Sequence, residues 1–397
     1  MTRLAILVTH PIQYHVPWFQ HLVRESGLVV KVFYLWDFGV TEQVDRAGFQ
    51  RAFKWDVPML EGYDFEFVPN TSVRPGTDHF GGLRNPGLIG RVEGFKPDAV
   101  LLFGYNFASL MKFIWCWKRA AAPLLFRGDS HRLLPESGLK EWLRRKAIST
   151  VYRRFAAFLY VGQANREYFE LHGVDSAALY FAPHAVDNAR FIAGAGDARE
   201  AALAWKKELG IPEGHRVVLF AGKFESKKRP QDLLRAFMQA GLRDVTLLLV
   251  GSGPLERELQ QVAGTHPAIR FAPFQNQSLM PRTYAAADLF VLPSSGSGET
   301  WGLAVNEAMC LSLPVIASSH VGCVADLVRH GHNGLVFPAG DVGALAGCLR
   351  EAFADPERLR RWGRAGSEMI AGYGYRQVTD GLLRALGQTA RKVRHDQ

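Results

Sequence analysis

The sequence predicts an α/β protein built from two doubly wound parallel sheets. Apolar segments of strand length alternate with helical segments through the N-terminal half, and the same alternation returns after residue 215. Strands separated by helices build parallel sheets with helices packed on both faces. A chain of 397 residues is long enough for two domains of ordinary size, each with its own core. We therefore expect two domains of the same architecture.

The composition indicates a globular protein, with 48% hydrophobic and 21% charged residues. Its net charge of +9 is compatible with nucleic acid, an anionic membrane surface or an anionic small molecule as partner. No recognised nucleic-acid module appears, which disfavours the first. The opening residues lack the hydrophobic core of a secretory signal, and no segment has the apolar length of a membrane span. Four cysteines without CxxC spacing predict free thiols, and we expect a cytoplasmic protein.

In the N-terminal half, five strands and one helix are predicted at definite positions. A helix is expected at 16–25, and strands are expected at 4–9, 29–36, 99–103, 123–126 and 158–162. In parallel sheets, ligands gather at the carboxyl ends of the strands. Polar clusters occur at three such ends, namely 10–15 (HPIQYH), 104–106 (GYN) and 127–131 (RGDSH).

A long irregular segment, 70–91, contains five glycines and no clear periodicity. Loops of this length in a compact domain are functional or mobile in most cases. Closure over an acceptor molecule and plain disorder both remain open from the sequence.

The segment 140–155 is basic and carries apolar residues at near-helical spacing, among them Trp142, Leu143 and Ile148. A basic amphipathic helix can lie on anionic lipid. The alternative is an ordinary domain helix with a solvated basic face. We favour this second interpretation and keep membrane contact as the alternative.

The second domain is expected to begin after a small, polar linker at 194–199. An apolar strand at 216–221 runs into GKFESKKRP (222–230) and then into a helix at 231–240. Cations at a helix N-terminus are disfavoured by the helix dipole. The lysines of this segment, Lys223, Lys227 and Lys228, therefore predict that an anion binds there.

The segment 291–317 combines a buried strand, a Ser/Gly loop, a helix and a further strand. Free backbone N–H groups and the positive dipole end at the start of a helix favour a phosphate. Glu299 and Glu307, eight positions apart, flank this point. Carboxylates there make sense as acceptors for hydroxyl groups on either side of the phosphate. A nucleotide sugar, with its ribose, diphosphate and hexose, has this layout.

The spacing of Glu299 and Glu307, with Ala-Met after the second, resembles the EX7E motif of family 4 retaining glycosyltransferases. Further segments are similar to elements of the same family: 181–191, 222–230, 251–254, 269–274, 321–326 and 331–338. The resemblance covers the second domain nearly throughout. Over the first domain it is mostly architectural, because HPIQY replaces the usual glycine-rich loop, although HPIQY loops resemble those of a bacterial subgroup.

This resemblance implies the GT-B fold, in which two Rossmann-like doubly wound domains face a central cleft. Residues 1–195 would form an N-terminal acceptor-binding domain, and 196–374 a C-terminal domain that binds the nucleotide sugar. The helix at about 375–397 would pack back on the first domain. The implied activity is transfer of a sugar, with retention at the anomeric carbon, to a hydroxyl of a glycan or lipid-linked glycan.

The resemblance also assigns roles to individual residues. Lys223 and Lys228 would hold the diphosphate, Glu299 the hydroxyls of the transferred sugar, and Glu307 the ribose. The cradle around the phosphates would be completed by Thr300, Trp301, Gly302 and Leu303. Gly251 supports the alignment, and Phe274 would meet the nucleobase, with core packing as our preferred alternative. In the first domain, Asp129 falls where the family has a catalytic histidine, and His131 lies two positions further on.

The family's front-face mechanism requires neither a cofactor nor a metal, and no DxD triplet is present to bind one. UDP or GDP is the expected nucleotide of the donor. Two alternatives remain open: another GT-B enzyme, such as a nucleotide-sugar epimerase or a phosphorylase, and a non-catalytic protein that binds sugar nucleotides. We expect a cytoplasmic enzyme of surface polysaccharide biosynthesis. Peripheral attachment to the inner face of the membrane is a further alternative.

Overall fold

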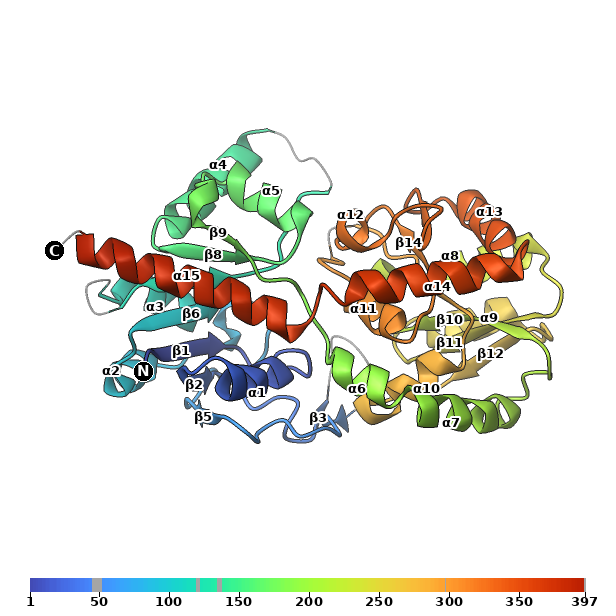
Figure 1. Ribbon diagram of the computed structural model, residues 1–397, viewed down its shortest axis with the longest axis horizontal. Coiled ribbons are helices and arrows are strands. Elements are labelled where there is room, and N and C mark those ends of the chain that lie inside the picture. Colours follow the sequence, from blue (N-terminus) through green and yellow to red (C-terminus); the bar gives the residue numbers. More distant parts are fainter. Residues whose placement is uncertain (45–51, 119–121, 134–137, 297, 396–397) are drawn as a thin grey trace. The chain divides into compact units, whose positions relative to one another are not determined.

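The computed structural model describes residues 1–44, 52–118, 122–133, 138–296 and 298–395 (Figure 1). The chain forms two compact units. Unit 1 comprises Met1–Gln43, Phe53–His184 and Tyr375–Gln397, and unit 2 comprises Val44–Ala52 and Ala185–Gly374. The chain thus enters unit 2 after His184, whereas the sequence placed this boundary at residue 195.

In unit 1, the described residues form a seven-stranded parallel sheet in the order β5-β2-β1-β6-β7-β8-β9. The bounds are β5 Asp64–Phe67, β2 Val29–Tyr34, β1 Arg3–Val8, β6 Ala99–Phe103, β7 Leu124–Arg127, β8 Ala157–Tyr160 and β9 Leu179–Phe181. The strands expected from the sequence at 4–9, 29–36, 99–103, 123–126 and 158–162 are confirmed as β1, β2, β6, β7 and β8. The two edge strands were missed, because DFEF alternates acidic and aromatic residues and LYF is only three residues long. A separate two-stranded sheet pairs β3 (Gln43–Val44) with β4 (Ala52–Phe53).

The helices of unit 1 cover both faces of its sheet. They are α1 Val16–Glu25, α2 Leu88–Phe95, α3 Ala108–Cys116, α4 Leu139–Tyr152, α5 Gln163–Leu171 and α15 Tyr375–His395, with 3₁₀ turns η1 Phe80–Gly82 and η2 Ser176–Ala178. α15 contacts α1, β8 and β9 (Figure 1). Its Gly381 permits this close packing, since a Cβ there would lie 2.1 Å from the carbonyl oxygen of Phe181. Trp18 of α1 donates a hydrogen bond to Thr379 of α15 at 3.2 Å.

The segment 70–91 is an ordered connection that runs into α2, so of the two alternatives left open by the sequence, plain disorder does not apply. The backbone N–H of Thr71 donates to the carbonyl of Arg84 at 2.8 Å, and Ser72 donates to the carbonyl of Gly81 at 2.8 Å. Asn85 is buried and donates to the carbonyl of Val68 at 2.7 Å. The loop is therefore fastened to the end of β5 by side-chain hydrogen bonds that its glycine-rich sequence does not reveal.

Unit 2 repeats the architecture. Its described residues form a six-stranded parallel sheet in the order β12-β11-β10-β13-β14-β15. The strands are β10 Arg216–Ala221, β11 Val245–Val250, β12 Ile269–Ala272, β13 Leu289–Leu292, β14 Val315–Ser318 and β15 Gly334–Phe337. Its helices are α6 Asn188–Ala193, α7 Ala195–Glu208, α8 Pro230–Ala240, α9 Glu256–Ala263, α10 Met280–Ala285, α11 Leu303–Cys310, α12 Val324–Leu327, α13 Val342–Phe353 and α14 Pro356–Ile370, with 3₁₀ turns η3 Ser226–Lys228 and η4 Gln277–Leu279. Since α7 begins at Ala195, the predicted linker at 194–199 is helical instead.

Each sheet reverses its strand order once, between β1 and β6 in unit 1 and between β10 and β13 in unit 2. In doubly wound sheets, ligands bind beside the carboxyl ends of strands at this reversal. The two lysine- and glutamate-bearing segments singled out in the sequence follow β10 and β13, so both lie at the reversal point of unit 2.

The four cysteines are free thiols, two of them (Cys310 and Cys323) buried and Cys116 exposed. Across the part of the chain that the structure describes, none of the helices has the length and apolar character needed to cross a membrane.

Candidate functional site

The centre of the candidate site is a buried ion pair between Lys228 and Glu299. Lys228 ends the 3₁₀ turn after β10, Glu299 lies in the loop after β13, and the ammonium donates to the carboxylate oxygen Oε2. The Ser294 hydroxyl donates to the same oxygen at 2.8 Å. The two charged side chains are 19% and 10% exposed. A pair this well buried needs further hydrogen bonds to offset its desolvation, and Ser294 supplies one of them.

The loops that carry this pair are also joined by their backbones. The N–H of Ser295 donates to the carbonyl of Lys227 at 2.8 Å. Lys227 is half-exposed and pairs with Glu225 at 3.3 Å. The sequence predicted that the lysine cluster needs an anion, and the protein supplies two carboxylates of its own. Lys223, Lys227 and Lys228 against Glu225 and Glu299 still leave 3 − 2 = +1 at this edge of the sheet.

Gly302 shapes the turn that follows Glu299. It has φ +98°, a left-handed conformation that favours glycine, and it immediately precedes α11. A Cβ at this position would lie 2.8 Å from Cγ1 of Val321 and 3.0 Å from Cδ2 of Leu292. The first N–H groups of a helix have no partner within it, so the start of α11 at Leu303 presents donors beside the ion pair.

Trp301 holds this turn from the inside. Its ring is buried, and its indole N–H donates to Oδ1 of Asn306 at 2.9 Å. Its carbonyl accepts from the N–H of Cys323 at 2.9 Å. The side chain of Trp301 therefore fixes the loop, and its neighbour Thr300 is half-buried next to Glu299.

Glu307 lies one turn further into α11 than the helix start. It is 2% exposed and accepts a hydrogen bond from the Tyr284 hydroxyl at 2.7 Å. The structure thus places Glu307 on the helix that follows the Glu299 loop, with its carboxylate anchored by a tyrosine.

Gly251 has a packing role that the sequence did not foresee. A Cβ on Gly251 would lie 1.9 Å from the carbonyl oxygen of Gly222, and one on Gly253 would lie 2.6 Å from that of Phe224. The two glycines after β11 therefore allow the loop after β10 to approach closely, which positions the lysine segment. Phe274 follows β12 and is half-buried, not a fully buried core residue as we preferred.

In unit 1, a second polar cluster forms at the carboxyl edge of the sheet. The Arg127 guanidinium is buried and donates to the carbonyls of Ala182 and Pro183 at 2.6 and 3.0 Å. Asp129 lies on the same loop, with its side chain 42% exposed, and its carboxylate is 3.4 Å from Nε2 of His184. The sequence flagged Asp129 but gave His184 no role.

His15 completes this cluster from the start of α1. Its ring lies 4.7 Å from that of Phe103. Burial, followed by the nearby His184 and Arg127, holds the pKa of His15 well below its usual value, and burial likewise lowers the pKa of His184. Burial also lowers the pKa of Arg127 to about 10. His131 is buried in the next turn, where its Nδ1 accepts from the N–H of Leu133 at 3.3 Å, so it helps to hold the loop.

Acid is expected to destabilise the protein through His15 and His184. Their folded pKa values lie below the value of about 6.5 for an unfolded imidazole, so between the two the unfolded chain binds more protons. The contribution is therefore present above about pH 6.5 and is lost as the pH falls toward the folded pKa, by at most about 1.4 kcal/mol per pH unit for each histidine. Urea unfolding at pH 7.5 and 5.5 measures this. His15→Phe should flatten the dependence, and His332→Gln at an exposed site should not. An unchanged slope in His15→Phe would contradict this assignment.

Within the residues that the structure describes, no three His, Cys, Asp or Glu side chains are grouped closely enough to hold a metal ion.

Comparison with known proteins finds similarity to glycosyltransferases, and the family match lies within unit 2. Residues 202–369 match the family model described as Glycosyl transferases group 1. The chain is 32% identical over 272 residues to the D-inositol 3-phosphate glycosyltransferase of Nocardia farcinica, covering 65% of this chain and 56% of that protein. It is 32% identical over 167 residues to the N-acetyl-alpha-D-glucosaminyl L-malate synthase of Bacillus anthracis, covering 42% and 43%. The chain spans about half the length of the curated relatives it matches.

Solved structures resemble the whole chain. HepE of Anabaena, crystallised with UDP and glucose, superposes with a TM-score of 0.71 at 18% identity, covering 98% of this chain and 100% of that one. WaaG, a glycosyltransferase of lipopolysaccharide biosynthesis, gives a TM-score of 0.65 at 17% identity, covering 95% and 97%. With two Rossmann-like units of parallel strands, the fold is GT-B, as the sequence predicted.

Proposed function

We propose that this protein is a retaining glycosyltransferase of the group 1, or family 4, type. It transfers a sugar from a nucleotide-diphosphate donor to a hydroxyl of a glycan or lipid-linked glycan. The observation that carries the proposal is the Lys228–Glu299 pair at the reversal point of the unit 2 sheet, beside the N-terminus of α11. This pair lies inside the segment that matches the glycosyl transferase family.

The donor's diphosphate would bind between the lysine segment and the start of α11. Lys223 and Lys228 supply positive charge, and the free N–H groups at Gly302 and Leu303 supply donors. Bound phosphate oxygens would share the Lys228 ammonium with Glu299. The Glu299 carboxylate then accepts from hydroxyls of the transferred sugar, and Glu307 from those of the ribose. UDP is the nucleotide we favour, because HepE was crystallised with it.

Sugar transfer needs no nucleophile from the protein. The bond between the anomeric carbon and the donor phosphate oxygen breaks, and its electron pair goes to the diphosphate. The acceptor hydroxyl forms the new bond on the same face and gives its proton to the departing phosphate oxygen. The charge that develops on the diphosphate is stabilised by Lys228 and the helix N-terminus, which act more strongly on the transition state than on the bound donor. The positive charge of the lysines takes the place of a metal ion in this proposal.

Unit 1 offers a place for the acceptor. A pocket of about 840 Å³ opens beside the carboxyl ends of β2 and β5. Its lining is mostly apolar and includes Leu35, Trp36, Leu60 and Phe67; the polar lining residues are Asp37, Thr41, Gln43 and Asn70. Such a lining fits an acceptor that joins an apolar group to a sugar. Asp129 and His184, at the carboxyl edge of the same sheet, would hold acceptor hydroxyls.

Trp36→Ala is expected to weaken binding of acceptors that carry an apolar group. In the parent protein, KM should fall from a methyl to an octyl glycoside, because the longer chain buries more apolar surface. In Trp36→Ala, the ratio of KM for the methyl glycoside to KM for the octyl glycoside should be about tenfold smaller than in the parent. The KM of the donor should be unchanged. Trp115→Ala, at a 48% exposed site on α3, is the matched control. Equal KM ratios in Trp36→Ala and the parent would exclude this pocket.

A donor screen that follows release of UDP, GDP and other nucleoside diphosphates tests the function itself. We expect turnover with one nucleotide sugar only when a hydroxyl acceptor is present, with the product linkage keeping the donor's anomeric configuration. Conversion of the donor alone would indicate an epimerase. Tight binding of UDP without turnover across an acceptor panel would indicate a non-catalytic binding protein.

The support for a role in assembling surface glycans comes from one solved structure of the same fold, WaaG, which is involved in lipopolysaccharide biosynthesis. Nucleotide sugars are cytoplasmic metabolites, so the proposed place of action is the cytoplasm. A deletion strain that lacks one surface glycan, restored by the parent protein and not by Lys228→Ala, would be the expected genetic result.

A further inference from the structure

Helix α4 presents an exposed face with an unusual composition. Leu139, Trp142 and Leu143 are 72%, 54% and 53% exposed, and positions three or four apart share one side of a helix. Lys146 follows at the next turn of the same side, with its ammonium 5.7 Å from the Trp142 ring. The outward face therefore places large apolar side chains directly beside basic ones.

The opposite face of α4 is an ordinary core face. Ile148, Val151 and Tyr152 are buried and belong to the hydrophobic cluster of unit 1. An amphipathic helix with a solvated basic face would carry its apolar residues only on that side. The three exposed apolar residues at the N-terminal end of α4 are thus not needed by the core.

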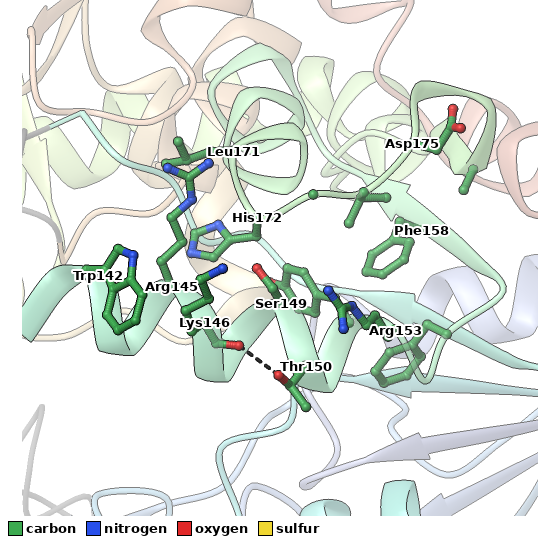
Figure 2. Close-up of a pocket in the computed structure, with 15 residues that line it drawn as sticks. Trp142, Arg145, Lys146, Ser149, Thr150, Arg153, Phe158, Leu171, His172 and Asp175 are labelled. Atoms are coloured by element: carbon green, nitrogen blue, oxygen red, sulfur yellow. Dashed lines mark hydrogen bonds between the residues drawn. The ribbon is translucent and has the colours of Figure 1, made fainter.

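A pocket of about 670 Å³ adjoins this face. It lies between α4 and the connection from α5 to β9, where Leu171 and His172 line the far wall (Figure 2). From α4 and the residue after it come the cationic side chains Arg145, Lys146 and Arg153, with the Ser149 and Thr150 hydroxyls between them (Figure 2).

The pocket is strongly positive. Its three cations stand against a single lining carboxylate, Asp175, which gives 3 − 1 = +2. That carboxylate accepts from the N–H of Ala177 at 2.8 Å and so caps a short turn of its own. His172 is buried, and burial lowers the pKa of its imidazole, so it adds a neutral hydrogen-bonding group at pH 7.

We propose that this face of unit 1 docks on an anionic phospholipid membrane. A lipid phosphate occupies the basic pocket, and Leu139, Trp142 and Leu143 enter the boundary between headgroups and acyl chains. Basic side chains attract anionic headgroups, and Trp and Leu on the adjoining turn add buried apolar area. A soluble phosphate would use the cations and leave the three apolar residues in water, so their shared face favours a lipid surface. This proposal is independent of the proposed sugar transfer.

Sedimentation with vesicles tests the proposal. The full chain should bind vesicles of phosphatidylglycerol and phosphatidylcholine (3:7) and should not bind pure phosphatidylcholine. Binding should weaken at 0.5 M NaCl, where charges are screened within a few ångströms. Arg145→Gln with Lys146→Gln should weaken binding about tenfold or more, since each basic residue near an anionic surface contributes on the order of 1 kcal/mol. Trp142→Ser with Leu143→Ser should also weaken it, while keeping its salt dependence.

The matched control is Arg243→Gln with Arg257→Gln, which removes the same charge from exposed sites of unit 2 and should bind vesicles like the parent protein. Circular dichroism melting confirms that each variant is folded, and UDP binding, which this surface should not affect, reports separately on the proposed function. If the Arg243 and Arg257 variant lost as much vesicle binding as the Arg145 and Lys146 variant, net charge alone would explain the loss and the proposal would be overturned. Unchanged binding in the Trp142 and Leu143 variant would also overturn it. So would absence of vesicle binding by a chain that binds inorganic phosphate at 10 mM, which would indicate a soluble anion.

Discussion

Lys228→Ala is expected to lower kcat for sugar transfer by two to three orders of magnitude. A hydrogen-bond donor that points at the charge developing in the transition state contributes on the order of 10²- to 10³-fold to the rate. Here the loss is compounded, because Glu299 would be left as a buried carboxylate without its ammonium and would face the incoming diphosphate. Initial rates with the donor found in the screen measure the effect.

Lys227→Ala is the matched control for this prediction. Lys227 is the preceding residue, is 49% exposed and pairs with Glu225. Exposed pairs contribute little, so we expect less than about a fivefold change in that variant. Glu299→Gln should also be strongly impaired, and the double variant should lose less than the product of the two single losses, since the residues form one unit. Equal activities of Lys228→Ala and Lys227→Ala would refute the assigned site.

Gly302→Ala is expected to disrupt both the donor site and the stability of unit 2. A left-handed φ costs a non-glycine residue on the order of 1–3 kcal/mol, and here the methyl group would also press on Val321 and Leu292. Relief of these contacts must shift the start of α11, so the N–H groups that it offers to the diphosphate would move with it. We expect a lower urea midpoint and at least a tenfold weaker affinity for UDP.

Gly347→Ala gives the control with the opposite sign. Gly347 lies inside α13, has a helical backbone and has open space where the methyl group would go. Alanine is favoured over glycine in a helix by up to about 1 kcal/mol, so this variant should be slightly more stable and should bind UDP normally. A Gly302→Ala protein with parent stability and parent affinity would show that the turn tolerates a side chain and that its geometry does not define the site.

The sequence predicted the regular elements best where their pattern is local. The helix at 16–25 and the strand at 99–103 appear with the expected bounds, because apolar periodicity and a proline near the helix start define them. It failed where tertiary contacts decide. The strand Asp64–Phe67 alternates acidic and aromatic residues at the edge of the sheet, and the segment after Gly194 joins a helix in spite of its small, polar composition.

The candidate site divides in the same way. The lysine segment and the two glutamates were found because each is a compact motif, whereas the pairing of Lys228 with Glu299 joins positions 71 residues apart. The unit 1 cluster was found in part. The sequence placed the segments of His15 and Arg127 at carboxyl ends of strands, but it gave no sign that His184, from a third segment, joins them at this edge.

The division of the chain between its units has a consequence for biosynthesis. Among the described residues, unit 2 is one continuous stretch apart from Val44 and Ala52, so its main part, Ala185–Gly374, can fold as soon as residue 374 has left the ribosome. Unit 1 is assembled from both ends of the described chain, since α15 closes over β8, β9 and α1. Its earlier-made part must therefore wait, with the α15-facing side uncovered, until the last helix emerges. Until then, the apolar side chains that α15 covers stay exposed to water.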